Sequence, residues 1–434
     1  KWLQISFCAK WACCHRPPMD DRRPFNNCFA LPPGVDWTPV DEALAALKAS
    51  ITTVVGVEDV GLSSALGRIL AEDAIAAINH PIHANAAVDG YAFAHASYLA
   101  GPMRIVEGRS AAGAPFGGSA QPGEAVRILT GGVIPEGADT VMLDEDSRIE
   151  QGVLHAPTGL KPGANRRKAG ENAEMGAPAL TTGTRLAPQA LSHAAAAGLT
   201  QLAVFKRLRV AILSTGDEVI EPGATQYPGA VIDANRPMLA GLAAAWGFDV
   251  VDLGIAPDDP AAVRAALDKG AAEADVILGS GGASAGDEDH MARLLGEEGT
   301  RAIWRIAMKP GRPLALGRWN GIPVFGLPGN PVAAFVCSLI FARPALMAMS
   351  GAGWVEPHVE TRPAAFAKRR KAGRREYLRG RLNDEGGVEV FANEGSGLIR
   401  GLVWASGLVD LPDGGPSIAE GDPVRFLPFS AFGC

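Results

Sequence analysis

The sequence lacks three features that would each place it in a particular class of protein. Its net charge of −7 and pI near 5.7 leave no basic surplus of the kind that nucleic-acid-binding proteins carry. Its six cysteines show no framework of spacings, which is typical of reduced thiols in the cytoplasm. Its longest apolar helical segment, 331–342, stops at Arg343 and is too short to span a bilayer. We therefore expect no binding to nucleic acid and no membrane span.

The length of 434 residues predicts roughly three domains of about 150 residues each. The first eighteen residues contain no uninterrupted apolar core for a signal peptide. We expect a disordered leader over residues 1–36, in which Met19 is a candidate for the natural start. Cys13, Cys14 and His15 lie in this leader, but adjacent cysteines lack the usual zinc spacing, which argues against a metal site.

The most informative stretch is 274–289, where a strand pattern runs into a glycine-rich loop and then into a helix. Val276, Ile277 and Leu278 form a continuous apolar run, typical of a strand buried on both faces of a parallel sheet. The loop carries Gly279, Gly281, Gly282 and Gly286, with Ser280 and Ser284 between them. Such a loop lets backbone N–H groups approach an anion, and the acids at 287–289 favour Mg²⁺ as a bridge to it.

Strands and helices alternate throughout 208–350, which predicts an α/β fold with a doubly wound parallel sheet. Polar residues collect just after the predicted strands. They are Thr215, Asp217, Glu218, Asp258, Ser280, Ser284, Asp289 and Lys309. Because ligands bind at the carboxyl edge of such sheets, we expect a binding site there.

Two other segments, 103–186 and 356–434, have short apolar runs broken by glycine and proline, the profile of small β domains. In the first, the basic residues 166–168 indicate either a phosphate site or an exposed charged turn. In the second, the basic run 368–371 is most simply a solvated loop. Between His80 and His83, whose spacing allows two metal ligands, a proline favours an irregular loop instead.

A series of short motifs runs through the chain in a fixed order. They are A-V-D-G-Y-A at 87–92, R-I-L-T-G at 127–131, L-S-T-G-D-E at 213–218, D-A-N-R at 233–236, D-D-P at 258–260, G-S-G-G-A-S-A-G at 279–286, K-P-G-R-P at 309–313 and L-P-G-N-P-V at 327–332. With these motifs the chain, from about residue 37 to the end, resembles the molybdopterin molybdotransferase family, the MoeA type that is also the E domain of gephyrin.

The resemblance implies a cytoplasmic, Mg²⁺-dependent enzyme that inserts molybdate into the dithiolene of adenylylated molybdopterin and releases AMP. It also implies a homodimer with a shared active site and suggests a contact with the adenylyltransferase of the same pathway. The four implied domains are a doubly wound one at 37–56 and 207–355, a linker domain at 57–75 and 177–206, an inserted β-rich domain at 76–176, and a C-terminal small β-barrel at 356–434.

The same resemblance assigns roles to individual residues. The implied catalytic residues are Asp89, Thr130, Glu218, Asp258, Asp289 and Lys309, and the implied metal ligands are Glu218, Asp258 and Asp289. The implied cofactor-binding residues are Gly281, Gly282, Ser284, Gly286, Arg305, Arg312, Pro328, Pro331, Arg374 and Ser396.

The chain departs from the family pattern at Asn172, where aspartate is usual, and at Ala86 and Ala333, where serine is common. Arg305 also replaces a usual lysine. Because asparagine can neither act as a base nor carry charge, a paralogue with reduced activity is one alternative. A binding or scaffold protein on the same fold is another. A dinucleotide-dependent oxidoreductase fits less well, since Ser284 stands at the third glycine of G-x-G-x-x-G.

Overall fold

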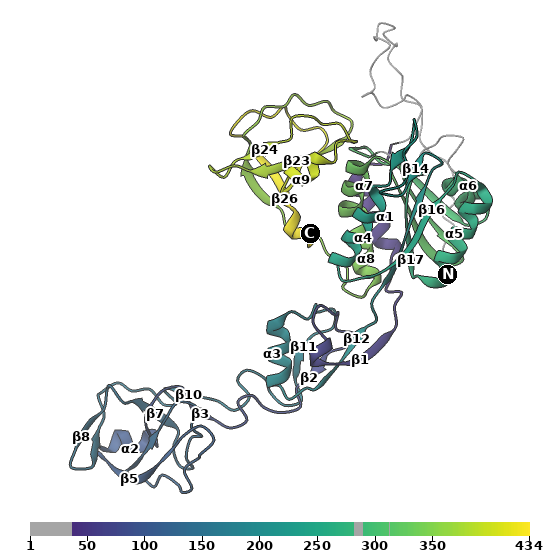
Figure 1. Ribbon diagram of the computed structural model, residues 1–434. Coiled ribbons are helices and arrows are strands. Elements are labelled where there is room, and N and C mark those ends of the chain that lie inside the picture. The colour runs from purple at the N-terminus through teal and green to yellow at the C-terminus, as the bar shows by residue number, and fades with distance from the viewer. Residues whose placement is uncertain (1–36, 282–289, 312) are drawn as a thin grey trace, which may run out of the picture. The chain divides into compact units, whose positions relative to one another are not determined.

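The computed structural model describes residues 37–281, 290–311 and 313–434 of the chain. The predicted leader therefore lies outside the described residues, as do the predicted site residues Gly282, Ser284, Gly286, Asp289 and Arg312. The elements are labelled in Figure 1.

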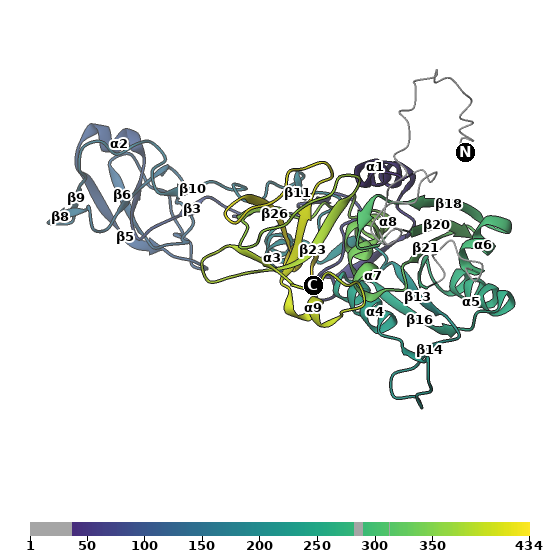
Figure 2. The same ribbon diagram turned by 90° about the horizontal axis from the view of Figure 1, so that it is seen from above.

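A six-stranded sheet with helices on both of its faces, which we call the central sheet, is built from residues 209–327 (Figures 1 and 2). Its strands, in spatial order, are β16 (Asp249–Ala256), β13 (Arg209–Thr215), β17 (Val276–Ser280), β21 (Ile322–Leu327), β20 (Pro313–Trp319) and β18 (Thr300–Arg305). The first four are parallel, whereas β20 is antiparallel to both of its neighbours. The predicted α/β fold with a doubly wound sheet is confirmed, and its four neighbouring strands β16, β13, β17 and β21 are parallel. The sheet also contains β20, which was not predicted and which is joined to β21 by a tight hairpin with no helix between.

Alternate residues of the parallel strands enter two separate cores, which is what makes the sheet doubly wound. Val210 and Ile212 of β13 pack in one core, and Ala211 and Leu213 pack in the other. The first core includes residues of α1 (Val40–Ser50), α4 (Asn235–Ala245), α7 (Pro331–Cys337) and α8 (Arg343–Met349). The second includes residues of α5 (Pro260–Glu273) and α6 (His290–Glu297), on the opposite side of the sheet in Figure 1.

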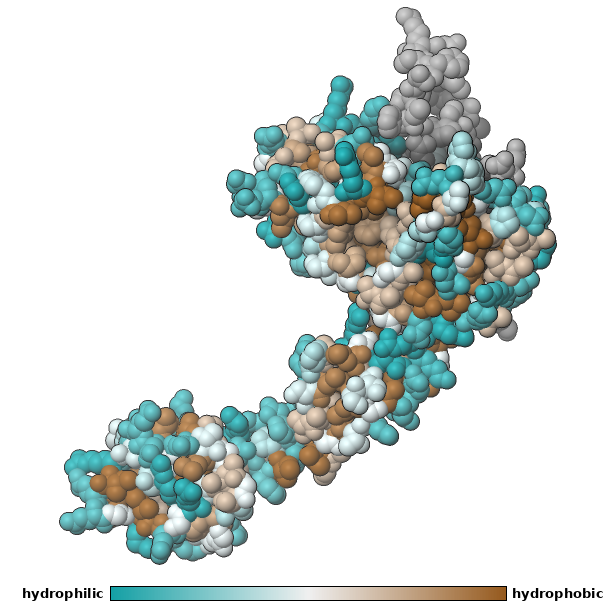
Figure 3. Space-filling view, viewed as in Figure 1, coloured by the Kyte–Doolittle hydropathy of each residue, from teal (hydrophilic) through white to brown (hydrophobic). Residues whose placement is uncertain are grey.

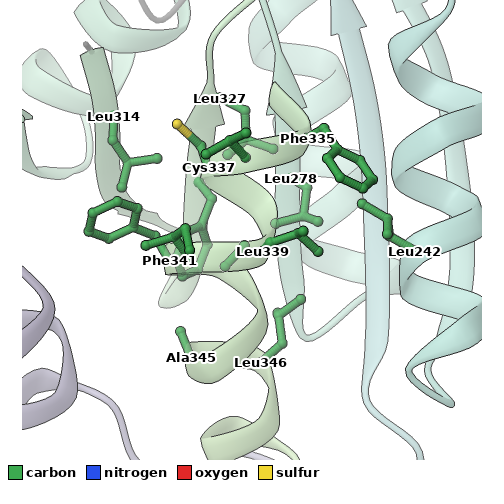
Figure 4. Close-up of a cluster of buried hydrophobic side chains, with 14 of the residues drawn as sticks. Leu242, Leu278, Leu314, Leu327, Phe335, Cys337, Leu339, Phe341, Ala345 and Leu346 are labelled. Atoms are coloured by element: carbon green, nitrogen blue, oxygen red, sulfur yellow. The ribbon is translucent and has the colours of Figure 1, made fainter. Parts of the chain in front are cut away.

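The helix predicted to stop at Arg343 continues through it to Met349, so that prediction is wrong. A π-helical segment over Ser338–Ala342 connects α7 to α8, so the helix is continuous. The Arg343 Nε donates to the Phe432 carbonyl oxygen over 2.9 Å, which allows the charged side chain to be buried. The resulting segment Pro331–Met349 is long and apolar enough to cross a membrane, but 89% of its most apolar window is buried inside the protein. Figure 4 shows Phe335, Leu339 and Leu346 of this segment packed as in a core helix.

Burial in this core makes Cys337 a testable marker of the packing. The thiol is 1% exposed, and desolvation raises its pKa to about 12. At pH 8 about one Cys337 thiol in ten thousand is then ionised, and the thiolate is the reactive form. We expect iodoacetamide to leave Cys337 unmodified while it alkylates the exposed Cys434, as read by peptide mass spectrometry. Alkylation of both at equal rates in the native protein would contradict the packing.

A second six-stranded sheet is built from residues 90–155. Its spatial order is β7 (Thr140–Leu143), β4 (Gly90–Phe93), β6 (Glu124–Ile128), β5 (Met103–Ser110), β9 (Val153–His155) and β8 (Arg148–Glu150). Beside it, β10 (Arg166–Arg167) pairs with β3 (Asn85–Ala86), so these two basic residues form a short strand and not a turn. Figure 3 shows scattered hydrophobic residues on this part of the surface, where Leu99 and Ile149 are exposed.

Two segments far apart in sequence join to form a smaller unit. Strand β1 (Val57–Gly61) pairs with β12 (Gln201–Phe205), and β2 (Ala74–Ile75) pairs with β11 (Pro178–Leu180), with α3 (Pro188–Ala196) packed against them. This pairing agrees with the composition of the predicted linker domain. The predicted domain boundaries themselves stay a prediction.

The C-terminal part is a β structure with its own core. Its sheet has the order β19 (Met308–Lys309), β23 (Arg375–Leu382), β25 (Gly407–Leu411), β26 (Pro423–Pro428) and β22 (Glu360–Pro363), and β24 (Val388–Val390) pairs with β23. The edge strand β19 comes from the connection between β18 and β20, so Lys309 stands beside Glu376 in register. The chain of the central sheet is thereby hydrogen-bonded directly to the C-terminal sheet.

Candidate functional site

The carboxyl ends of the parallel strands present buried polar atoms that have no hydrogen-bond partner in the described protein. These atoms are Ser214 Oγ, Thr215 Oγ1 and Asn235 Oδ1. Ser214 stands next to Ser280 in register, and Ser280 stands next to Leu327. Because a buried polar atom without a partner is costly and uncommon, this edge of the sheet has the character of a ligand site. We call it the polar edge.

Asn235 holds the polar edge together. Its Nδ2 donates to Ser280 Oγ and to the Gly329 carbonyl oxygen, each over 2.7 Å. Asn235 is the first residue of α4 and is 8% exposed. The amide group therefore ties the ends of β17 and β21 together and leaves Oδ1 available as an acceptor.

Gly281 allows the backbone to approach closely at the same edge. Its φ is +91°, and a Cβ at this position would lie 2.6 Å from the Thr215 carbonyl oxygen and 2.9 Å from Thr215 Oγ1. At Gly329 a Cβ would lie 3.8 Å from the Gly281 Cα. Backbone segments therefore pack closely together at the polar edge, as they do where a protein binds a phosphate or another oxyanion.

Acidic residues flank the polar edge. Asp258 N–H donates to Asp217 Oδ1 over 2.9 Å, and Asp217 N–H donates to Asp258 Oδ2 over 3.3 Å. Together the two hydrogen bonds occupy one oxygen of each carboxylate, so the other oxygen of each stays open to a hard cation such as Mg²⁺. Glu218 is the next residue along and is exposed. Over residues 37–281, 290–311 and 313–434, no three His, Cys, Asp or Glu side chains converge on a metal position.

That result bears on the metal sites considered from sequence. His80 and His83 belong to no such convergent group within the ranges that the structure covers. The predicted triad of Glu218, Asp258 and Asp289 stays a prediction, because Asp289 lies outside the described residues. Asp258 and Glu218 follow β16 and β13 at one edge, so two of its three members share a location.

A shallow recess opens beside α7 and the C-terminal sheet. Its lining residues are Lys309, Pro310, Val332, Tyr377, Leu378, Arg379, Val390, Phe391 and Glu394. The Val332 N–H at the start of α7 donates to the Ser396 carbonyl oxygen over 3.0 Å. Of the predicted positions, Lys309 lines the recess, and Pro331 and Ser396 adjoin its lining residue Val332.

The remaining described residues of the predicted set are placed around these features. Arg305 ends β18, which runs parallel to β21, so it lies at the same carboxyl edge of the sheet. Pro328 is buried directly after β21, and a Cβ at Gly311 would lie 3.6 Å from its ring. Arg374 is 6% exposed and directly precedes β23.

Asp89 and Thr130 belong to the other six-stranded sheet, at the start of β4 and after the end of β6. The Thr130 hydroxyl and its N–H each donate to Asp89 Oδ1 over 2.6 Å. The hydroxyl hydrogen bond, followed by the backbone one, lowers the pKa of the Asp89 carboxyl. This exposed carboxylate is thus oriented and kept ionised by one neighbouring residue.

Removing the hydroxyl tests this pairing. Thr130→Val is expected to raise the pKa of Asp89 toward its ordinary value, because the largest stabilising contact of the charged form is lost. Because the pKa of Asp89 is depressed in the wild type, the two hydrogen bonds contribute their full stabilisation above the ordinary pKa. This stabilisation is lost as the pH falls through the depressed pKa. In Thr130→Val only the backbone hydrogen bond to Asp89 remains, and its stabilisation should be lost at a higher pH than in the wild type. Thr130→Ser is the control and should keep the low pKa. Carboxyl-carbon NMR titration measures both, and an unshifted Thr130→Val would refute the assignment.

Several site residues were not predicted from the sequence. Lys368 was expected in a solvated loop, and that prediction is wrong: its side chain is only 13% exposed and is paired with Glu394 and Glu376. Asn235 lies within D-A-N-R, a motif that gave the family resemblance without indicating a role for the amide. Glu394 carries no motif, so nothing in the sequence signals it.

The fold and the polar edge define an α/β protein with a candidate ligand site at the carboxyl end of a doubly wound sheet. Three family models match the chain: MoeA N-terminal region (domain I and II) over residues 38–198, Probable molybdopterin binding domain over 211–348, and MoeA C-terminal region (domain IV) over 361–429. The chain belongs to the MoeA family, and the resemblance inferred from its motifs is confirmed.

Individual relatives agree with the family models. The molybdopterin molybdenumtransferase of Haemophilus influenzae is 32% identical over 397 residues, which are 90% of this chain and 98% of that protein. Molybdopterin molybdenumtransferase 2 of Mycobacterium tuberculosis is 34% identical over 84% of this chain and 93% of its own length. The crystal structure of the molybdopterin biosynthesis MoeA protein from Pyrococcus horikoshii OT3 superposes with a TM-score of 0.77 at 26% identity. The superposition covers 91% of this chain and 100% of the Pyrococcus horikoshii chain.

Proposed function

We propose that this protein is a molybdopterin molybdenumtransferase, which inserts molybdate into adenylylated molybdopterin and releases AMP. Two relatives at 32% and 34% identity, each named molybdopterin molybdenumtransferase, support the transferase activity. The observation that carries the proposal is the polar edge, where three buried polar atoms have no partner in the described protein and Gly281 brings its backbone close to Thr215. A role as scaffold alone would not require such a site.

The residues of the site suit the groups that this reaction involves. Adenylylated molybdopterin carries phosphates and molybdate is a tetrahedral dianion, so backbone N–H groups near Gly281 and the Lys309 ammonium would hold oxyanions. Asn235 Oδ1 would accept a hydrogen bond from the substrate. Glu218 and Asp258 would hold Mg²⁺ together with substrate phosphates, since carboxylate oxygens are ligands that this ion prefers. The ion would supply Lewis acidity at the pyrophosphate.

The proposal extends to the assembly. We infer a cytoplasmic homodimer in which Asp89 and Thr130 of one subunit complete the site of the other. The family resemblance and the oriented, ionised Asp89 carboxylate support this arrangement. A contact with the adenylyltransferase that makes the substrate belongs to the same proposal.

The test is molybdate-dependent AMP release from adenylylated molybdopterin by the purified protein, followed chromatographically. We expect AMP release in the presence of molybdate and Mg²⁺. Removing Mg²⁺ with a chelator should stop AMP release, and adding Mg²⁺ back should restore it. Asn172→Asp is the matched variant: Asn172 is exposed, and its backbone N–H, which this change keeps, donates to the His80 carbonyl oxygen over 2.9 Å.

Each pattern of activity has a separate meaning. Activity in the wild type supports the transferase and shows that Asn172 is tolerated. Activity only in Asn172→Asp identifies a reduced-activity paralogue. No AMP release by either protein would reject the enzyme and favour a binding or scaffold role.

A further inference from the structure

Four charged side chains meet at the recess beside α7. The Glu394 carboxylate bridges two ammonium groups: Oε2 accepts from Lys309 Nζ and Oε1 accepts from Lys368 Nζ. Behind them, Glu376 Oε2 lies 3.3 Å from Lys368 Nζ and 3.8 Å from Lys309 Nζ. Two ammonium groups and two carboxylates thus lie close together, and the Arg379 guanidinium lines the same recess.

The two carboxylates occupy different settings. Glu376 is 4% exposed and lies within β23, between β19 and β25, so its position is fixed by backbone pairing. The Glu394 side chain is 38% exposed and forms part of the recess wall. Glu376 is therefore a permanent counter-charge, whereas Glu394 can exchange its contacts for water or for another anion.

The loop that carries Glu394 is held by contacts that do not involve its carboxylate. The Arg379 guanidinium donates to the carbonyl oxygens of Asn393, Gly395 and Leu398 over 2.5, 3.3 and 2.8 Å. The Val332 N–H donates to the Ser396 carbonyl oxygen. The carboxylate can therefore leave the lysines while the loop backbone keeps its place.

A carboxylate with one oxygen on each of two lysines imitates two oxygens of a tetrahedral oxyanion. We propose that Lys309 and Lys368 form an oxyanion-binding pair, and that Glu394 is an internal anion which the oxyanion must displace. Without the Glu394 carboxylate, two ammonium groups face one buried carboxylate and the cluster carries a net positive charge. Identifying the oxyanion as molybdate rests on the proposed function. The lysine pair and its internal anion do not.

This arrangement makes anion binding a competition. An anion that offers one charge and one contact gains little by replacing a carboxylate that already satisfies both lysines. A tetrahedral dianion offers two charged oxygens to the same pair and still interacts with solvent through the others. Glu394 would thus set a threshold that admits tetrahedral dianions and excludes chloride.

Calorimetric titration of the full chain with molybdate, without molybdopterin and at constant ionic strength, tests the proposal. Sulfate serves as a second tetrahedral probe. We expect Glu394→Gln to bind both ions at least about tenfold more tightly than wild type, because a neutral amide no longer competes for the lysines. Lys368→Met should weaken binding by about tenfold in the Glu394→Gln background.

Matched controls come from the same part of the chain. Glu420→Gln and Lys371→Met make the same chemical changes at exposed positions and should leave both dissociation constants within about twofold of wild type. Glu394→Ala, together with a thermal melt of every variant, guards against a folding defect in one of them.

The outcomes separate the inference from the proposed function. Equal affinity of wild type and Glu394→Gln, or no binding by either, would overturn the inference even if AMP release is intact. If Glu394→Gln gains no more affinity than Glu420→Gln, the gain reflects the change in net charge alone, and the inference is overturned as well. Tighter binding by Glu394→Gln that depends on Lys368 supports it even where no AMP is released.

Discussion

Gly281→Ala is expected to reduce AMP release by about 100-fold or more, because misplacing a site by about 1 Å has effects of that size. The added methyl group would lie 2.6 Å from the Thr215 carbonyl oxygen, so the ends of β13 and β17 would have to separate. This separation would displace Thr215 Oγ1 and the adjoining Ser214 Oγ, two of the three unpartnered atoms of the polar edge. Steady-state assays at saturating molybdate would show the loss.

The control for Gly281→Ala is Gly321→Ala. Gly321 has a φ of +90°, against +91° for Gly281, and a Cβ there would meet no atom within 4 Å. Both substitutions force alanine into the left-handed region, at a cost of about 1–2 kcal/mol. Only Gly281→Ala adds a clash at the polar edge. If both variants lose activity equally, backbone strain explains the loss and the polar edge is not the substrate site.

The central sheet was predictable where a strand has two buried faces. Val276–Ile277–Leu278 is apolar throughout because alternate side chains enter two cores, and such runs are visible in the sequence. Strand β20 was missed because it follows the proline- and glycine-rich stretch 309–313, which resembles a loop. Its hairpin to β21 turns at Asn320 and Gly321, both with positive φ. Asn-Gly is a strong local signal for such a hairpin turn, so this turn can be recognised from the sequence.

The site was predictable to the extent that its residues follow strands. Asp258 and Glu218 were expected at one edge because parallel strands end together, and the structure places them there. Lys368 and Glu394 could not be predicted, since their meeting with Lys309 depends on the pairing of β19 with β23. Such pairing between distant segments leaves no local pattern. Likewise, Arg343 was taken as the end of a helix because its distant acceptor, the Phe432 carbonyl oxygen, is invisible in sequence.

Asp410→Ala is expected to destabilise the C-terminal sheet by about 3–5 kcal/mol, the cost of leaving a buried charge without its partner. Asp410 is 1% exposed, and its two oxygens accept from Arg375 Nε and Nη2 over 2.6 and 2.7 Å. Arg425 Nε donates to the same carboxylate over 2.9 Å. Hydrogen–deuterium exchange of β23 and β25 measures the loss locally, without assuming that the whole chain unfolds in one step.

Asp41→Ala is the control, because it removes another carboxylate from the same guanidinium. Asp41 lies on α1, accepts from Arg375 Nη1 over 2.6 Å and has a side chain that is 85% exposed. An exposed ion pair contributes roughly 0.2–1 kcal/mol, so exchange in β23 should change little. Equal effects of the two variants would mean that Arg375 acts mainly by joining α1 to the C-terminal sheet. A large effect of Asp410→Ala alone would mean that the buried pair holds β23 to β25, and with it the strand that carries Glu376 beneath Lys309 and Lys368.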